Sequence, residues 1–217
     1  MSCTGVILAG GGATRFGGAP KGLERVGGRR IIDRVAAALQ QVTDDLLLIA
    51  NADDAATWLP HVRTARDVRA GAGALGGLHA ALTHAAAPIL LVAWDMPFVS
   101  PALLGELRRL GEVSEAPDAM IMSSEIAFPV APTDAVLPES DGSRRGVEPL
   151  CAWYHPRCLP AIERTLDAGD LRVVGFHSEV RVTRVPVSRV RDFGDPARLF
   201  SNVNSPDDLL VAERTHG

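Results

Sequence analysis

Residues 5–23 read Gly5-Val-Ile-Leu-Ala-Gly-Gly-Gly-Ala-Thr-Arg-Phe-Gly-Gly-Ala-Pro-Lys-Gly-Leu23, and the rest of the chain is organised around them. The apolar run at 6–9 predicts a buried strand, and the glycines that follow predict a loop. A glycine backbone can bring several N–H groups close to an anion, and Arg15 and Lys21 add positive charge beside it. The stretch therefore predicts a strand that ends in a phosphate-binding loop.

Two familiar glycine motifs do not fit this loop. A P-loop, G-x-x-x-x-G-K-[ST], requires lysine directly after Gly17, where the chain has Gly18. The dinucleotide fingerprint fails because Arg15 stands in place of its third glycine. The remaining pattern, L-A-G-G-x-x-x-R-x-G-x-x-x-K, runs from Leu8 to Lys21. It resembles the signature loop of nucleotidyltransferases, which move a nucleoside monophosphate from an NTP to a phosphorylated acceptor.

Composition narrows the class of protein. The 217 residues carry a formal net charge of −4, which argues against a broad basic face for nucleic acid. The apolar runs are shorter than the roughly 18 residues of a membrane span, so we expect no membrane association and a cytoplasmic location. The three cysteines form no C-x-x-C pair, and we expect them to be reduced and packed in the core. The histidines show no metal-like spacing.

The order of apolar segments predicts an α/β fold. Strand-like runs alternate with helix-period segments, as in a mainly parallel sheet covered on both faces. In the first half we predict strands at 6–9, 46–50, 62–65 and 89–94, a short helix at 53–59, and longer helices at 32–42, 78–85 and 101–110. The segment 70–77 is predicted to be a second glycine-rich loop. Ser100 is predicted to cap the helix at 101–110.

The second half has a weaker pattern. We predict strands at 119–122, 149–154 and 180–187, a helix at 156–166, and a terminal helix capped by Ser205. Residues 125–146 are rich in proline and polar side chains, which predicts an irregular excursion. Residues 171–176 are ambiguous between strand and helix.

Four breaks in the pattern should meet at one edge of the sheet. These are the loop 10–21, Asn51, the segment 67–77 and Asp95, each of which follows a predicted strand. In an open parallel sheet the ligand crevice lies outside the carboxyl ends of the strands. We therefore expect a binding site there.

Nucleotidyl transfer makes modest chemical demands on these residues. Charge builds on the α-phosphate while pyrophosphate leaves, so catalysis depends on positioning and neutralisation. Lys21 and Arg15, with the N–H groups of Gly10 and Gly11, are predicted to bind the triphosphate. Asp95 is predicted to hold a Mg²⁺ ion, which favours one or two carboxylates together with substrate oxygens. The acceptor phosphate is already anionic and needs no strong base.

Two more segments extend the resemblance along the chain. They are Trp94-Asp-Met-Pro-Phe98 and Phe200-Ser-Asn-Val-Asn-Ser-Pro-Asp-Asp-Leu209. With the loop, they resemble molybdenum cofactor guanylyltransferases, the MobA family. The resemblance implies a three-layer Rossmann-like fold that uses Mg²⁺ to transfer GMP from GTP to molybdopterin. It also implies one domain over 1–217, with a nucleotide-binding half (1–111) and an acceptor half (112–217), and transient contacts with molybdopterin-synthesis proteins and apo-molybdoenzymes.

The resemblance also assigns site residues. Three are expected to act in catalysis: Arg15, Lys21 and Asp95. The expected nucleotide-binding residues are Leu8, Ala9, Gly10, Gly11, Lys21, Asn51, Asp67 and Asp95, the last also on the metal. Guanine is expected to be selected by main-chain and small-residue contacts around the first loop and Gly76-Gly77. Asn202 and Asn204 would face the acceptor, although both could be simple turn residues before a helix cap.

The chain departs from the family pattern at three positions. Pro20 precedes the lysine where aspartate is common, Ala74 stands where proline is common, and Glu148 stands where His or Gln is frequent. Two other functions stay open. One is transfer of CMP to molybdopterin, or of another nucleotide to a sugar or alditol phosphate. The other is a non-catalytic protein that binds and delivers the nucleotide or cofactor.

Overall fold

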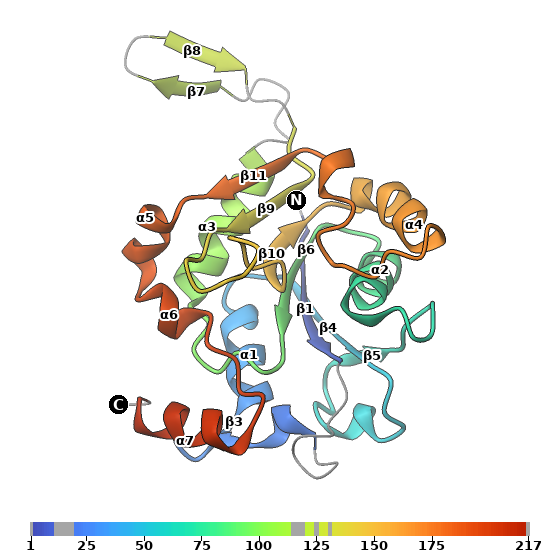
Figure 1. The fold of residues 1–217 in the computed structure, drawn as a ribbon, viewed down its shortest axis with the longest axis vertical. Coiled ribbons are helices and arrows are strands. Elements are labelled where there is room, and N and C mark those ends of the chain that lie inside the picture. Colours follow the sequence, from blue (N-terminus) through green and yellow to red (C-terminus); the bar gives the residue numbers. More distant parts are fainter. Residues whose placement is uncertain (1, 11–19, 114–119, 124–125, 130–131, 216–217) are drawn as a thin grey trace.

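One mixed sheet forms the centre of the protein. The computed structural model describes residues 2–10, 20–113, 120–123, 126–129 and 132–215. Within them, seven strands form this sheet in the order β11-β9-β10-β6-β1-β4-β5 (Figure 1). The strands are β1 (Thr4–Ala9), β4 (Asp45–Ala50), β5 (Arg63–Ala65), β6 (Ile89–Ala93), β9 (Ala135–Pro138), β10 (Cys151–Tyr154) and β11 (Val182–Val185). Strand β10 pairs antiparallel with both neighbours, and the other pairs are parallel. The expected mainly parallel sheet is confirmed.

Helices cover both faces of this sheet. The helices are α1 (Ile31–Gln40), α2 (Gly73–Ala85), α3 (Pro101–Val113), α4 (Leu159–Asp167), α5 (Val187–Val190), α6 (Pro196–Leu199) and α7 (Pro206–Arg214). Helices α1 and α3 pack on one face, and α2 and α4 on the other (Figure 1). The three-layer α/β architecture is therefore confirmed. Within the described part of the chain, no helix is long and apolar enough to span a bilayer.

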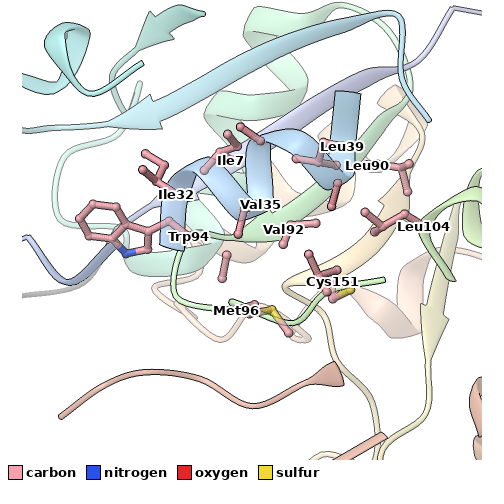
Figure 2. Close-up of a cluster of buried hydrophobic side chains, with 14 of the residues drawn as sticks. Ile7, Ile32, Val35, Leu39, Leu90, Val92, Trp94, Met96, Leu104 and Cys151 are labelled. Carbon is pink, nitrogen blue, oxygen red and sulfur yellow. The ribbon is translucent and has the colours of Figure 1, made fainter. Parts of the chain in front are cut away.

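Two hydrophobic cores result from the alternation of side chains along the strands. Neighbouring strand residues point to opposite faces, so Ile7 enters one core and Val6 the other. Figure 2 shows the first core, in which Leu39 of α1 lies near Leu90 of β6, and Val35 lies near Val92. Because both faces are buried, each central strand reads as a continuous apolar run in the sequence.

Two hairpins lie outside the main sheet. Strands β2 (Arg25–Val26) and β3 (Arg29–Arg30) pair antiparallel, and Gly27 and Gly28 join them with φ of 58° and 73°. Such positive φ angles favour glycine, and they allow a tight turn between the two strands. Strands β7 (Met120–Ser123) and β8 (Ile126–Pro129) form a separate two-stranded sheet at the top of Figure 1.

Residues 125–146 were predicted to be irregular, and this prediction is wrong. The segment contains β8 and also β9, all four residues of which are buried in the main sheet. Strand β9 covers only four residues and ends at a proline, so its apolar run is too short for a periodic signal. Its pairing with β10 and β11 comes from residues far along the chain.

Three smaller predictions also need correction. The predicted loop at 70–77 is helical from Gly73. The buried Gly76 and Gly77 allow the first turns of α2 to pack closely. A Cβ on Gly77 would collide with the Leu8 side chain of β1. Residues 171–176 form neither a strand nor a helix: 173–176 make a turn, and just before it the Asp170 carboxylate accepts a hydrogen bond from the backbone N–H of Arg172 (2.9 Å). Within 53–59 the helical part is a 3-10 turn, Ala55–Thr57.

Candidate active site

A cavity of about 610 Å³ opens at the carboxyl ends of β1, β4 and β6. It is the crevice expected at this edge of a parallel sheet. Nine of the predicted site residues line it: Leu8, Ala9, Gly10, Lys21, Asn51, Asp67, Asp95, Asn202 and Asn204. Gly11 and Arg15 lie outside the described residues. Residues as far apart in the sequence as Leu8 and Asn204 are thus brought to one cavity.

Lys21 and Asp95 form an ion pair in this cavity. The Lys21 Nζ lies 2.5 Å from Asp95 Oδ2 and donates a second hydrogen bond to Asn204 Oδ1 at 2.7 Å. The two charged side chains are 15% and 9% exposed. Such a poorly solvated ammonium and carboxylate neutralise each other, and each is available to exchange its partner for a ligand charge.

The backbone around Asp95 is fixed by strand β1 and by the segment that precedes α7. Trp94 N donates to the carbonyl of Leu8 (3.2 Å), which extends the β1–β6 pairing to the cavity edge. Val203 N donates to the Asp95 carbonyl (2.9 Å), so the segment before α7 crosses directly beside the carboxylate. Ser205 Oγ accepts from Asp208 N, which confirms the predicted helix cap and holds Asn204 close to Lys21.

Lys21 is positioned by a small aromatic platform. It begins a 3-10 helix, Lys21–Leu23, whose Gly22 lies against the indole of Trp94. A Cβ added to Gly22 would lie 2.6 Å from Trp94 Cδ2, so a side chain there would push the turn away. Trp58 stacks on the same indole with ring centroids 5.2 Å apart. The close approach of Gly22 therefore sets the direction of the lysine.

Asn51 and Asp67 form a second polar pair on the opposite wall. Asn51 Nδ2 donates to Asp67 Oδ2 (2.7 Å), and Asp67 N donates to Asn51 Oδ1 (3.0 Å). They follow the neighbouring strands β4 and β5, as the sequence predicted, but their direct pairing was not predicted. The pair fixes the orientation of polar atoms at the cavity rim.

Apolar and small residues complete the cavity, and several of them were missed by sequence reasoning. Ile49, Gly71 and Gly73 line it, as do Gly77 and Leu150. Ile49 could have been found, because residues two apart on a strand share a face and Asn51 was already a candidate. Leu150 precedes β10, and the sequence carried no signal that this strand lies beside β6. Gly76, expected near guanine, is buried in α2 and does not line the cavity.

The donor set suits a hard divalent cation that a substrate helps to bind. Among the described residues, no group of three or more His, Cys, Asp or Glu is placed so that it could hold a metal ion by itself. Asp95 offers one carboxylate, and the Asn204 amide oxygen lies close by, because both accept hydrogen bonds from Lys21. Mg²⁺ commonly uses one or two carboxylates and completes its shell with waters and phosphate oxygens. The residues therefore fit Mg²⁺ bound together with a nucleotide.

A second cavity of about 530 Å³ adjoins the first. The two share the wall residues Ala74, Leu150 and Asn202. The charged residues in the lining of the second cavity are Arg145, Glu148 and Arg172. A ligand that fills the first cavity can therefore meet a second ligand across a common boundary.

The cysteines lie away from this chemistry. Cys3, Cys151 and Cys158 are free and buried, as expected. Burial raises the pKa of each thiol to about 12, so the thiolate needed for nucleophilic or metal chemistry does not form at neutral pH. Trp94, Trp153 and Phe200 are buried in the core.

Gly10, Lys21 and Asp95 lie together at the carboxyl edge of a mainly parallel sheet, which is the arrangement of a nucleotidyltransferase of α/β architecture. The model of one family, described as the MobA-like NTP transferase domain, matches residues 5–182. The chain belongs to this family, as its resemblance predicted.

Relatives and solved structures agree with this assignment. The chain is 32% identical to "Molybdenum cofactor guanylyltransferase" of Desulfosudis oleivorans, covering 97% of this chain and 94% of the relative. It is 37% identical to "Probable molybdenum cofactor guanylyltransferase" of Pelotomaculum thermopropionicum, with coverage of 98% and 92%. The crystal structure of "Molybdopterin-guanine dinucleotide biosynthesis protein A" from Archaeoglobus fulgidus aligns with a TM-score of 0.76 and 27% identity over 97% of both chains.

Proposed function

We propose that this enzyme transfers GMP from GTP to molybdopterin and releases pyrophosphate, forming molybdopterin guanine dinucleotide. The observation that carries the proposal is the Lys21–Asp95 pair. It lies at the carboxyl ends of β1 and β6, in a cavity large enough for a nucleotide. The names of near full-length relatives support the choice of GTP and molybdopterin over other nucleotides and acceptors.

The reaction is an exchange at the α-phosphorus of GTP. An oxygen of the acceptor phosphate forms a bond to the α-phosphorus, and the bond from that phosphorus to the bridging oxygen of the β-phosphate breaks. The electron pair leaves with pyrophosphate. The nucleophile is already an anion, so the residues need only align the two phosphates and offset their mutual repulsion.

Lys21 changes partners in this scheme. Its ammonium is held ready by Asp95 and Asn204, and it turns to the phosphate oxygens when GTP enters. Mg²⁺, bound through Asp95 and the phosphates, would neutralise charge that develops on the phosphate oxygens. Arg15 and Gly11, which belong to the same loop in the sequence, are proposed to contact the triphosphate as well.

The remaining walls have proposed roles in binding. The Asn51–Asp67 pair would bind the nucleoside part of GTP, while Leu8 and Gly77 allow the guanine ring close contact with the strand and helix backbone. Asn202 lies at the boundary of the two cavities, where the acceptor phosphate must arrive. Residues 1–111 would thus serve mainly the nucleotide, and 112–217 mainly the acceptor.

The cellular location and the protein partners of the enzyme are part of the same proposal. A cytoplasmic location fits the three free, buried cysteines and the use of GTP. The acceptor and product would be exchanged in transient contacts with molybdopterin-synthesis proteins and apo-molybdoenzymes.

A direct assay tests the reaction. Purified enzyme is incubated with Mg²⁺, molybdopterin and one of GTP, CTP, ATP or UTP, and the products are resolved by mass. The expected result is the guanine dinucleotide with an equal amount of pyrophosphate, and far less product from the other nucleotides. Formation of only the cytosine dinucleotide, or of no dinucleotide with active molybdopterin, would reject the proposal.

A further inference from the structure

The acceptor must extend beyond the nucleotide cavity. Its phosphate has to reach the α-phosphate of GTP near Lys21, so the larger part of the acceptor lies on the far side of this point. The second cavity begins there, because Ala74, Leu150 and Asn202 belong to both cavities. The second cavity is therefore the space for the ring system of the acceptor.

Glu148 is the acidic group in the lining of this second cavity. Its backbone is fixed on both sides: Glu148 N donates to the carbonyl of Pro138 (3.0 Å), and its own carbonyl accepts from Cys151 N (3.1 Å). The side chain is half-buried, and the hydroxyl of the buried Ser140 forms a hydrogen bond with it. The carboxyl group thus has a defined place in the turn that precedes β10.

This carboxyl group lacks a charged partner. No ion pair to Glu148 occurs among the described residues, and Arg172, on the same cavity, is already paired with Asp170 at 2.6 Å. Burial raises the pKa of Glu148, in spite of the Ser140 hydrogen bond, which lowers it. A carboxylate has about four acceptor positions, so most of its capacity is left for a ligand that donates hydrogen bonds.

A pterin ring offers donors that match these acceptors. Its pyrimidine half carries an N3–H and an adjacent 2-amino group, and the two N–H bonds point in nearly the same direction. A carboxylate can accept both in parallel, as it does from a guanidinium, and such charge-assisted hydrogen bonds are about twice as strong as neutral ones.

We propose that Glu148 selects the acceptor by accepting hydrogen bonds from the N3–H and 2-amino group of its pterin ring. This inference rests on the proposed function, because it takes molybdopterin as the acceptor. It assigns Glu148 to recognition and leaves the reacting phosphates to Lys21 and Asp95.

The test compares pterin with lumazine, which carries a carbonyl oxygen where pterin carries the 2-amino group. Binding of each fluorescent ring to the GTP-bound, full-length protein is titrated. The wild type should bind pterin at least about tenfold more tightly, the factor that one charge-assisted hydrogen bond supplies. In Glu148→Gln the preference should fall below about threefold, because the amide can rotate and donate to the lumazine carbonyl.

A neighbouring glutamate provides the matched control. Glu139 is also half-buried and lies in the same connection to β10, but it lines neither cavity. Glu139→Gln should keep the wild-type preference for pterin. Both variants should bind GTP as the wild type does, and Glu148→Gln should raise the KM for molybdopterin about tenfold with little change in kcat.

Two results would overturn the inference. One is a wild type that does not distinguish pterin from lumazine, and the other is an unchanged preference in Glu148→Gln. Either can occur while the guanine dinucleotide is still formed, so it would count against Glu148 alone. Failure to form the dinucleotide with the wild type would count instead against the proposed function.

Discussion

Asp95→Asn tests the charge arrangement of the active site. The substitution keeps the shape of the side chain and removes its charge, so Lys21 loses its ionic partner and the proposed metal loses its carboxylate. Two unit charges 2.5 Å apart attract by about 7 kcal/mol at an effective dielectric constant of 20. Desolvation of both groups offsets most of this attraction.

The expected loss of stability is modest. Breaking a fully buried pair costs about 3–5 kcal/mol. Here the side chains are 15% and 9% exposed, and Lys21 keeps its hydrogen bond to Asn204, so we expect about 2 kcal/mol. For a chain of this size that corresponds to a Tm about 4–8 °C lower. Asp45→Asn is the control, because it breaks an exposed pair with Arg63 and should cost less than about 1 kcal/mol.

The effect on turnover should be much larger than the effect on stability. Loss of one electrostatic contact to the reacting phosphates lowers kcat by at least about 10²-fold. Mg²⁺ should no longer strengthen GTP binding to Asp95→Asn. Lys21 is the only lysine in the chain, so an amine-reactive reagent, followed by peptide mass analysis, should label it faster in the variant. Turnover close to that of the wild type, with Mg²⁺ still enhancing GTP binding, would refute this reasoning.

Three further predictions concern packing, thiols and pH. Gly77→Ala should lower stability by about 1–3 kcal/mol and weaken GTP binding, because the added Cβ would collide with Leu8. Gly105→Ala is the control, because its added Cβ would lie 3.6 Å from the nearest atom, in Val42. In the same melting and titration experiments it should be neutral or slightly stabilising. No thiol should react with a disulfide reagent at pH 8 until denaturant is added, and partial reaction in the native state would contradict the burial of the cysteines. Burial and the charge of Arg184 lower the pKa of His177 to about 4, so below pH 6.5 the unfolded chain binds a proton that the folded chain does not. Between pH 6.5 and 4 the wild type should therefore lose stability faster than His177→Gln, and parallel melting curves would contradict this assignment.

Local patterns were sufficient to predict which residues at the ends of β1, β4 and β6 line the first cavity. Strand β1 is a short apolar run followed by glycines, and polar residues such as Asn51 and Asp95 end the strands beside it. Because parallel strands end at the same edge of the sheet, their order along the chain predicts which side chains meet. The structure places these residues around one cavity.

The second half of the chain was harder to predict, although Asn202 and Asn204 were named from the resemblance and both line the first cavity. Strand β9 is too short to show a period, and its burial depends on partners on either side of it. The contact between Lys21 and Asn204 joins residues 183 positions apart, and the sequence gives no distance for it. Glu148 stood out only as a departure from a pattern. Its position beside Leu150 in the second cavity required the fold.

The measurement that tests the central claim most directly is a crystal structure of the enzyme with Mg²⁺ and a GTP analogue that cannot be cleaved at the α-phosphate. We predict that the triphosphate lies at the end of β1, with Lys21 Nζ within hydrogen-bonding distance of a phosphate oxygen and with Asp95 bound to the metal. A triphosphate lodged elsewhere, with the Lys21–Asp95 ion pair intact beside it, would contradict the account.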